Sequence, residues 1–136
     1  MDLSPYLIVV IDDSQTVRGA ACAILEKAGA QVVEAVDGYD GLAAVVAKQP
    51  DLVLVDIMMP RLDGLQLTAI LKGHSEMRHL PVVLVSSKQS LFDQARGKLM
   101  GADGYLVKPF SADELLTAVR SALLRSDDQN ASRGDE

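Results

Sequence analysis

The sequence predicts an α/β fold in a single domain, with a doubly wound parallel sheet. Five short runs of Val, Leu and Ile alternate with segments in which apolar residues recur at helical spacing. These runs are apolar throughout, which is typical of parallel strands that helices cover on both faces. A length of 136 residues and a hydrophobic fraction of 49% suit one packed core.

Strands and helices are expected to follow one another along most of the chain. The strands are expected at 6–11, 31–35, 52–55, 82–85 and 104–107. The helices are expected around 17–28, 42–46, 64–73, 91–100 and 112–123. Ser14 is a typical N-cap residue for the first helix, and Gly29 ends it. Ser111 caps the last helix, with Glu114 three residues later as a capping box.

Right-handed crossovers between parallel strands restrict how these units assemble. The flavodoxin-like order 2-1-3-4-5 places the first and third strands side by side, and ligands of such sheets bind beyond the carboxyl ends of the strands. We assign residues 1–125 to this domain. Residues 126–136 are polar residues, Ala and Gly only, and are expected to form a disordered tail.

The composition disfavours several classes of protein. The chain has 13 basic and 19 acidic residues and a net charge of −6, which disfavours direct binding to nucleic acid. Cys22, the single cysteine, fits a buried thiol in a reducing compartment. No apolar run approaches the roughly 18 residues that span a bilayer, and the chain starts without the basic region of a signal peptide. We expect a cytoplasmic protein without membrane insertion.

Charged residues stand where three of the predicted strands end. Asp12 and Asp13 follow the first strand, Asp56 the third and Lys108 the fifth. Carboxylates that share a cleft repel, since two unit charges about 4 Å apart cost on the order of 4 kcal/mol at an effective dielectric constant near 20. Mg²⁺ takes oxygen ligands of this kind, whereas the lack of His or Cys beside the acids argues against zinc or copper.

Each of these residues has a simpler interpretation when it is taken alone. Asp12 and Asp13 can merely begin a helix, where acids are favoured, and Asp56 can cap a loop. The combination argues against this interpretation, because Ser86 and Lys108 also follow or end strands of the same predicted sheet. We therefore expect one functional pocket at the carboxyl edge of the sheet.

Several motifs at these strand ends resemble the receiver domains of two-component response regulators. They are Asp12-Asp13-Ser14, the stretch 56–60 with Asp63-Gly64, Ser86-Ser87 and Lys108-Pro109-Phe110. The resemblance covers Tyr6 to about Arg125. A narrower likeness, in the stretches 37–40, 59–64, 86–88 and 91–93, is to the single-domain regulators of twitching-motility, type IV pilus chemosensory systems.

The resemblance implies a phosphorylation switch rather than an enzyme with a separate substrate. Asp56 would accept a phosphoryl group from a sensor histidine kinase and carry it as an aspartyl phosphate. The cofactor Mg²⁺ would be bound by Asp12, Asp13, Asp56 and the backbone carbonyl of Met58. The hydroxyl of Ser86 and the amine of Lys108 would contact the phosphoryl group, and the chain would assist both its own phosphorylation and its dephosphorylation.

The resemblance also implies an output surface around the helix at 91–100, the strand at 104–107 and the last helix. The candidate switch or output residues are Ser86, Lys88, Tyr105 and Pro109. A cis bond before Pro109 would aim Lys108 into the cleft. Tyr105 either turns inward when Ser86 moves or is an ordinary half-buried tyrosine. The output partner would be a downstream protein, and the chain a monomer or a weak dimer that forms on phosphorylation.

Three other functions stay open beside this leading hypothesis of a stand-alone switch, in which no effector domain follows the last helix. A receiver-like binding module would act without phosphorylation, although the full set of acids, hydroxyl and lysine argues against it. A phosphatase or mutase needs a general acid two residues after its nucleophile, where this chain has Met58. An FMN carrier shares the sheet order, but this chain lacks tryptophan and a hydroxyl-rich phosphate loop.

Overall fold

The computed structural model describes residues 2–87 and 91–134 of the chain. Lys88, one of the expected output residues, lies outside the described residues. Within these ranges, strands and helices alternate from the first strand to the last helix, which confirms the expected α/β class. The same part of the chain contains no helix that is long and apolar enough to cross a bilayer.

One parallel sheet contains the strands in the order β2-β1-β3-β4-β5, as predicted. The strands are β1 (Leu7–Ile11), β2 (Gln31–Ala35), β3 (Leu52–Asp56), β4 (Val82–Ser86) and β5 (Gly104–Val107). In the centre of the sheet, Ile8 of β1 lies opposite Val32 on one side and Leu52 on the other. The carboxyl ends of β1 and β3 are therefore neighbours.

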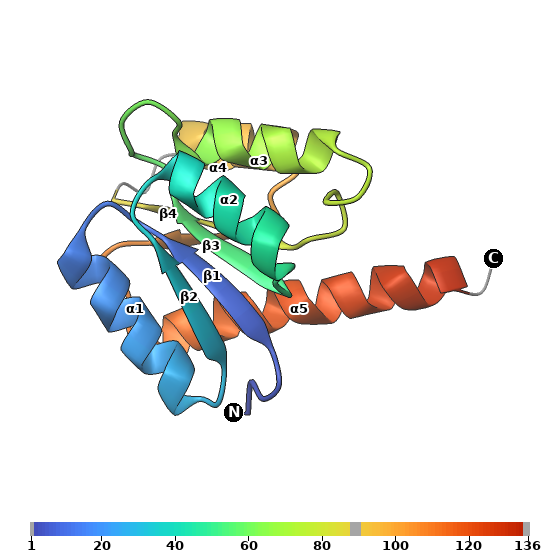
Figure 1. Ribbon diagram of the computed structural model, residues 1–136, viewed down its shortest axis with the longest axis horizontal. Helices are drawn as coiled ribbons and strands as arrows, with labels where there is room; N and C mark the ends of the chain where they lie inside the picture. Colours follow the sequence, from blue (N-terminus) through green and yellow to red (C-terminus); the bar gives the residue numbers. More distant parts are fainter. Residues whose placement is uncertain (1, 88–90, 135–136) are drawn as a thin grey trace.

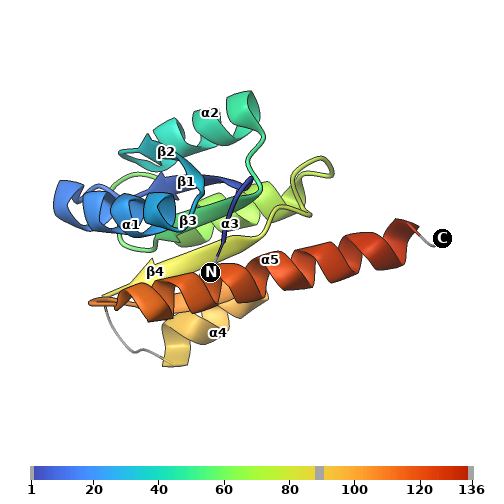
Figure 2. The ribbon, with the colours of Figure 1, turned by 90° about the horizontal axis from the view of Figure 1, so that it is seen from below.

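Helices cover both faces of this sheet (Figure 2). They are α1 (Gln15–Lys27), α2 (Gly38–Lys48), α3 (Gly64–Gly73), α4 (Leu91–Leu99) and α5 (Ala112–Gly134). Ile8 and Val10 face the layer of α1 and α5, whereas Val9 and Ile11 face the layer of α2 and α3. Because alternate side chains of β1 enter two different cores, the strand is apolar at every position.

The predicted caps form at the helix ends that adjoin the carboxyl edge of the sheet. The Ser14 hydroxyl accepts from the Val17 N–H at 3.4 Å at the start of α1. In α5 the Ser111 hydroxyl accepts from the Glu114 N–H at 3.1 Å, and the Glu114 carboxylate accepts from the Ser111 N–H at 3.0 Å. The hydrogen bond from the Ser111 main-chain N–H, and then the Ser111 side chain, lower the pKa of the Glu114 carboxyl.

The last helix is longer than the sequence predicts, since α5 continues past Arg125 to Gly134. Figure 1 shows its carboxyl-terminal part extending away from the sheet and the other helices. Elongation of an existing helix adds one hydrogen bond for each residue that is fixed and requires no new nucleation. Composition does not reveal such an extension, and the division into a domain at 1–125 and a tail at 126–136 stays a prediction.

Gly64, the first residue of α3, packs directly against the end of β3. Its N–H donates to the carbonyl of Ile57 at 3.1 Å. A Cβ at this position would lie 2.5 Å from the carbonyl oxygen of Asp56 and 2.9 Å from the Cα of Ile57. These neighbours are main-chain atoms, which cannot rotate away. The absence of a side chain at Gly64 therefore allows α3 to approach the residue that ends β3.

We expect the substitution Gly64→Ala to lower the free energy of unfolding by about 1–3 kcal/mol, because the added methyl group forces backbone atoms apart. Gly19→Ala is the matched control, since nothing lies within 4 Å of its Cβ position in α1. That change should raise the free energy of unfolding by about 0.5–1 kcal/mol. Urea denaturation measures both values, and equal values for the two variants would contradict this account.

We expect the thiol of Cys22 to react slowly in the folded protein. Cys22 is 4% exposed, and burial, followed by the charges of Glu34 and Glu26, raises its pKa to about 11. A rise from 9.0 to about 11 reduces the thiolate fraction near pH 8 about a hundredfold. Ellman's reagent should therefore react with Cys22 at least about a hundredfold faster in urea than in buffer. Similar rates in both media would show that the thiol is accessible.

Candidate functional site

Four residues that the sequence selects stand at the carboxyl edge of the sheet. Asp12 and Lys108 directly follow β1 and β5, whereas Asp56 and Ser86 are the last residues of β3 and β4. Asp56 lies opposite Val85, the residue before Ser86. Because parallel strands end at the same edge, residues that are far apart in the sequence meet here.

Lys108 connects two of the acids. Its Nζ lies 3.2 Å from Oδ2 of Asp12 and 3.1 Å from Oδ2 of Asp56. The two carboxylates are buried, with exposed fractions of 4% for Asp12 and 5% for Asp56. Since water contributes little screening at such depth, the amine is the main source of positive charge for both side chains.

Asp13 completes an acidic cluster with Asp12 and Asp56. One carboxylate oxygen from each residue lies within 4.8 Å of the other two, and Asp13 is the exposed member. Three acids and one lysine leave two negative charges without a counter-charge in the described part of the site. Hard oxygen donors with this charge fit a divalent cation such as Mg²⁺ better than a softer metal.

The pKa values of the site reflect this shortage of positive charge. Burial raises the pKa of the Asp56 carboxyl, and the negative charge of Asp12 raises it further, against the opposing hydrogen bond from Lys108. Burial alone would lower the pKa of the Lys108 amine, but its contacts with Asp56 and Asp12 outweigh burial and raise it. The amine therefore stays charged at neutral pH.

Main-chain groups orient the two buried acids. The Ser14 N–H donates to Oδ1 of Asp12 at 2.8 Å, so Ser14 and Lys108 occupy the two oxygens of that carboxylate. The Met58 N–H donates to Oδ1 of Asp56 at 3.4 Å. The backbone of Met58 therefore lies beside Asp56, the candidate phosphoacceptor. Met58 as a whole is 68% exposed. Metal binding by its carbonyl stays a prediction.

The remaining candidates lie on β4 and β5. Ser86 is 2% exposed, and its carbonyl accepts from the Lys108 N–H at 2.7 Å. The peptide bond between Lys108 and Pro109 is cis, as the resemblance implies. Tyr105 is half-buried on β5, so the described structure is compatible with both interpretations of this residue, and its switching role stays a prediction.

Comparison with known proteins agrees with this geometry. Residues 8–120 match the family model of the response regulator receiver domain. The chain belongs to this family. Protein PilG of Pseudomonas aeruginosa is 48% identical over 114 residues, which are 84% of each chain. Protein PilH of the same organism is 40% identical over 116 residues, which are 85% of this chain and 96% of PilH.

The fold of this receiver domain is also found in solved structures. The Vibrio cholerae chemotaxis protein CheY4 superimposes with a TM-score of 0.82 and 28% sequence identity. The match covers 86% of this chain and 98% of CheY4. The family resemblance and the strand order that the sequence predicts are thus confirmed.

Arg18 is a residue of this receiver domain that the sequence analysis missed. Its Nη1 donates to the main-chain carbonyl of Asp12 at 2.7 Å, and its Nε pairs with the Glu34 carboxylate at 3.0 Å. A signal was present, because Arg18 stands on the same helical face as Cys22 and Leu25, both buried. A charged residue on an otherwise buried face needs a polar partner.

We expect Asp13→Asn to stabilise the receiver domain when divalent cations are absent, because one of three mutually repelling acids becomes neutral. The free energy of unfolding should rise by about 0.5–1 kcal/mol, the magnitude of an exposed charge interaction. Addition of Mg²⁺ should stabilise the wild type more than the variant and reverse the order. Urea denaturation with and without Mg²⁺ measures both effects, and an unchanged order would contradict this assignment of the acidic cluster.

Proposed function

We propose that this receiver domain is a phosphorylation switch in which Asp56 accepts a phosphoryl group from a sensor histidine kinase. The observation that carries the proposal is the position of Asp56. Its carboxylate is buried at the carboxyl edge of the sheet, 3.1 Å from Lys108 and within an acidic cluster. A structural ion pair would need one acid for one amine, whereas this pocket has three acids.

In the proposed reaction an oxygen of ionised Asp56 attacks the phosphorus atom of a phosphohistidine. A P–O bond forms as the P–N bond breaks, and the electron pair of that bond returns to the histidine of the kinase. Phosphoryl transfer depends mainly on positioning and on neutralisation of charge. Hydrogen bonds from the Met58 N–H and the Lys108 amine support the position of the Asp56 carboxylate.

Mg²⁺ would neutralise charge on the phosphoryl oxygens, with Asp12, Asp13, Asp56 and the Met58 carbonyl as the groups proposed to bind it. Lys108, which follows the edge strand β5, supplies a second positive charge. During transfer the Lys108 amine weakens its hydrogen bond to Asp56 and donates to a phosphoryl oxygen. Ser86, at the end of the neighbouring strand β4, supplies the proposed hydroxyl donor.

Contacts of this kind are strong enough to shift a conformational equilibrium. A hydrogen bond to a charged group contributes about 1.5–3 kcal/mol, so Ser86 and Lys108 together supply roughly 3–6 kcal/mol. Conversion of a population from 1:99 to 99:1 requires about 5.5 kcal/mol. The upper end of this range is enough for such a conversion and the lower end gives roughly equal populations. Tyr105 is the proposed residue that changes side-chain position when the phosphorylated receiver domain adopts its output conformation.

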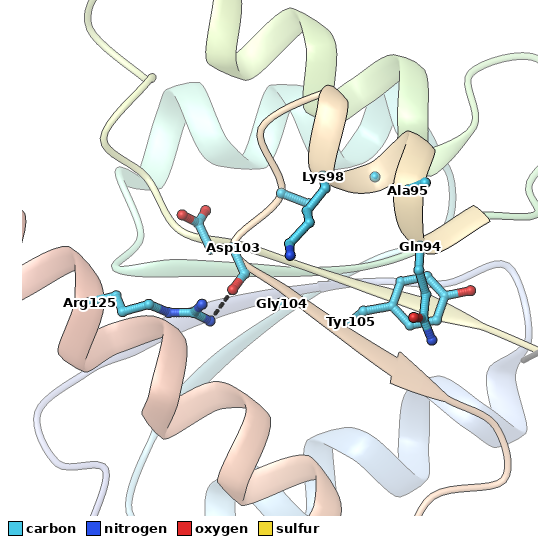
Figure 3. A pocket seen from close by; sticks show the side chains of 9 residues that line it. Gln94, Ala95, Lys98, Asp103, Gly104, Tyr105 and Arg125 are labelled. Carbon is cyan, nitrogen blue, oxygen red and sulfur yellow. Dashed lines mark hydrogen bonds between the residues drawn. The ribbon is translucent and has the colours of Figure 1, made fainter. Parts of the chain in front are cut away.

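The proposed output surface lies at the edge of the sheet, where α4, β5 and α5 meet. A hollow of about 350 Å³ opens between them, and Figure 3 shows Lys98, Tyr105 and Arg125 along its walls. The Arg125 guanidinium donates to the carbonyl of Asp103 and thereby connects α5 with the residue before β5. Tyrosine and arginine are enriched in protein interfaces, and a polar rim is typical of them, so this hollow suits a protein partner.

An exposed aromatic residue on α4 extends this surface. Phe92 is 70% exposed, and the Arg96 guanidinium lies 5.6 Å from the centre of its ring. Aromatic and arginine side chains are the residue types that most often dominate binding energy in protein interfaces. We include Phe92 and Arg96 among the residues that would contact the downstream protein.

The narrower likeness in the sequence suggests the type of pathway, and the relatives suggest the domain organisation. The chain matches 84% of PilG and 96% of PilH, so these relatives have little sequence outside the receiver domain. We extend this organisation to the present chain and propose a single-domain regulator of a chemosensory pathway, with pilus-based motility as the output. The proposal includes a cytoplasmic location and a monomer, or a weak dimer on phosphorylation, that contacts protein and not nucleic acid.

Incubation with acetyl phosphate and Mg²⁺ should add the mass of one phosphoryl group to the wild-type protein, and Asp56→Asn should abolish this addition. Asp51→Asn is the matched control, because Asp51 precedes the same strand at its opposite end. Intact-mass spectrometry measures the labelling of all three proteins. Removal of Mg²⁺ with a chelator should slow labelling of the wild type and of the control.

Two results would overturn the proposal. Labelling of Asp56→Asn at the wild-type level would place the phosphoryl group elsewhere. Failure of the wild type to become labelled by acetyl phosphate or by histidine kinases would favour a binding module that acts without phosphorylation.

A further inference from the structure

Among the described residues, Arg18 is the only arginine whose side chain donates a hydrogen bond to the main chain of the acidic cluster. It lies in the first turns of α1, and its side chain is 12% exposed. Two of its nitrogens have separate partners, the Asp12 carbonyl at 2.7 Å and the Glu34 carboxylate at 3.0 Å. The guanidinium therefore connects α1, the end of β1 and the outer strand β2.

The bond to the Asp12 carbonyl restricts the position of both neighbouring acids. That carbonyl belongs to the planar peptide unit that joins Asp12 to Asp13, so fixing the oxygen fixes the direction in which the chain enters Asp13. On its other side, Asp12 is fixed by its own N–H, which donates to the Ala35 carbonyl at 3.2 Å. The backbone of Asp12 is thus bound on both sides, by β2 and by Arg18.

The role of Arg18 is positional rather than electrostatic. Its charge is already compensated by Glu34, and its contact with Asp12 is made through a main-chain oxygen and not through the carboxylate. Lys108 and the Ser14 N–H occupy the Asp12 carboxylate instead. Arg18 therefore supports the acids without competing with a cation for their oxygens.

We propose that Arg18 is a positioning residue for the divalent-cation site of this receiver domain. Arg18 fixes the Asp12–Asp13 peptide and thereby holds the carboxylates of Asp12 and Asp13 on the same side of the site. A cation can then bind without first ordering the loop between β1 and α1. Residues that orient metal ligands typically change metal affinity by about 10–100-fold when they are replaced. The inference rests on the proposed function, because it assumes that the acidic cluster binds Mg²⁺.

The test compares cation affinity in Arg18→Ala, Arg18→Lys and wild type. Mn²⁺ is the probe, with the free ion measured by electron paramagnetic resonance, and Mg²⁺ as competitor. We expect Arg18→Ala to bind Mn²⁺ and Mg²⁺ at least about tenfold more weakly than the wild type. The cation affinity of Arg18→Lys should be intermediate, because an ammonium lacks the planar guanidinium that directs a nitrogen to the Asp12 carbonyl.

A kinetic readout separates positioning from general destabilisation. For labelling by acetyl phosphate, the Mg²⁺ concentration that gives half the maximal rate should rise at least about tenfold in Arg18→Ala, and the rate at saturating Mg²⁺ should change little. Glu34→Gln removes the ion pair but retains the Asp12 contact, so its cation affinity should stay close to the wild-type value. Arg120→Ala, on the exposed face of α5, controls for the loss of one positive charge.

The outcomes are distinguishable. If Arg18→Ala and Arg18→Lys are folded by circular dichroism and bind Mn²⁺ as the wild type does, Arg18 is only a structural ion-pair residue and the inference is wrong. The inference is also wrong if Glu34→Gln and Arg18→Lys weaken binding equally. If the wild type binds neither Mn²⁺ nor Mg²⁺, the proposed function fails, and the inference fails with it.

Discussion

The amine of Lys108 lies between two buried carboxylates, 3.1 Å from Asp56 and 3.2 Å from Asp12. With Asp13 beside them, the pocket contains three acids and one base. Burial of charge is unfavourable unless the charge is paired, so this arrangement persists only because the surrounding structure keeps the side chains together. The uncompensated negative charge also makes the pocket receptive to a cation, which connects the stability of the fold with its chemistry.

The scaffold resists the repulsion in the pocket through main-chain contacts. Ser14 and Met58 donate N–H groups to the carboxylates of Asp12 and Asp56, and Arg18 binds the Asp12 carbonyl. Gly64 lets α3 pack against the end of β3. Groups at the ends of strands are positioned more accurately than groups on free loops, because the strand hydrogen bonds fix their backbone.

The same strand that presents Lys108 also borders the surface proposed for output. Tyr105 lies on β5 three residues before Lys108 and lines the hollow between α4, β5 and α5. A phosphoryl group at Asp56 would draw the Lys108 amine away from its present contacts, and the movement would begin at the end of this edge strand. Edge strands have one free side, so they can adjust without rearrangement of the central sheet. In the proposed switch, this location would allow a local change of charge to alter the output surface.

The strand order and the residues that meet at the carboxyl edge of the sheet could be predicted before the structure was known. Continuous apolar runs mark buried parallel strands, and in a parallel sheet the residues that follow each run share one edge, so Asp12, Asp56 and Lys108 could be placed together. The burial pattern of α1 indicates that Arg18 needs a polar partner, but the partner itself became evident only in the folded chain, because it is a main-chain carbonyl that no side-chain pattern encodes. The extension of α5 to Gly134 was likewise invisible in the sequence, because a polar composition fits both a disordered tail and a helix that elongates from a docked segment.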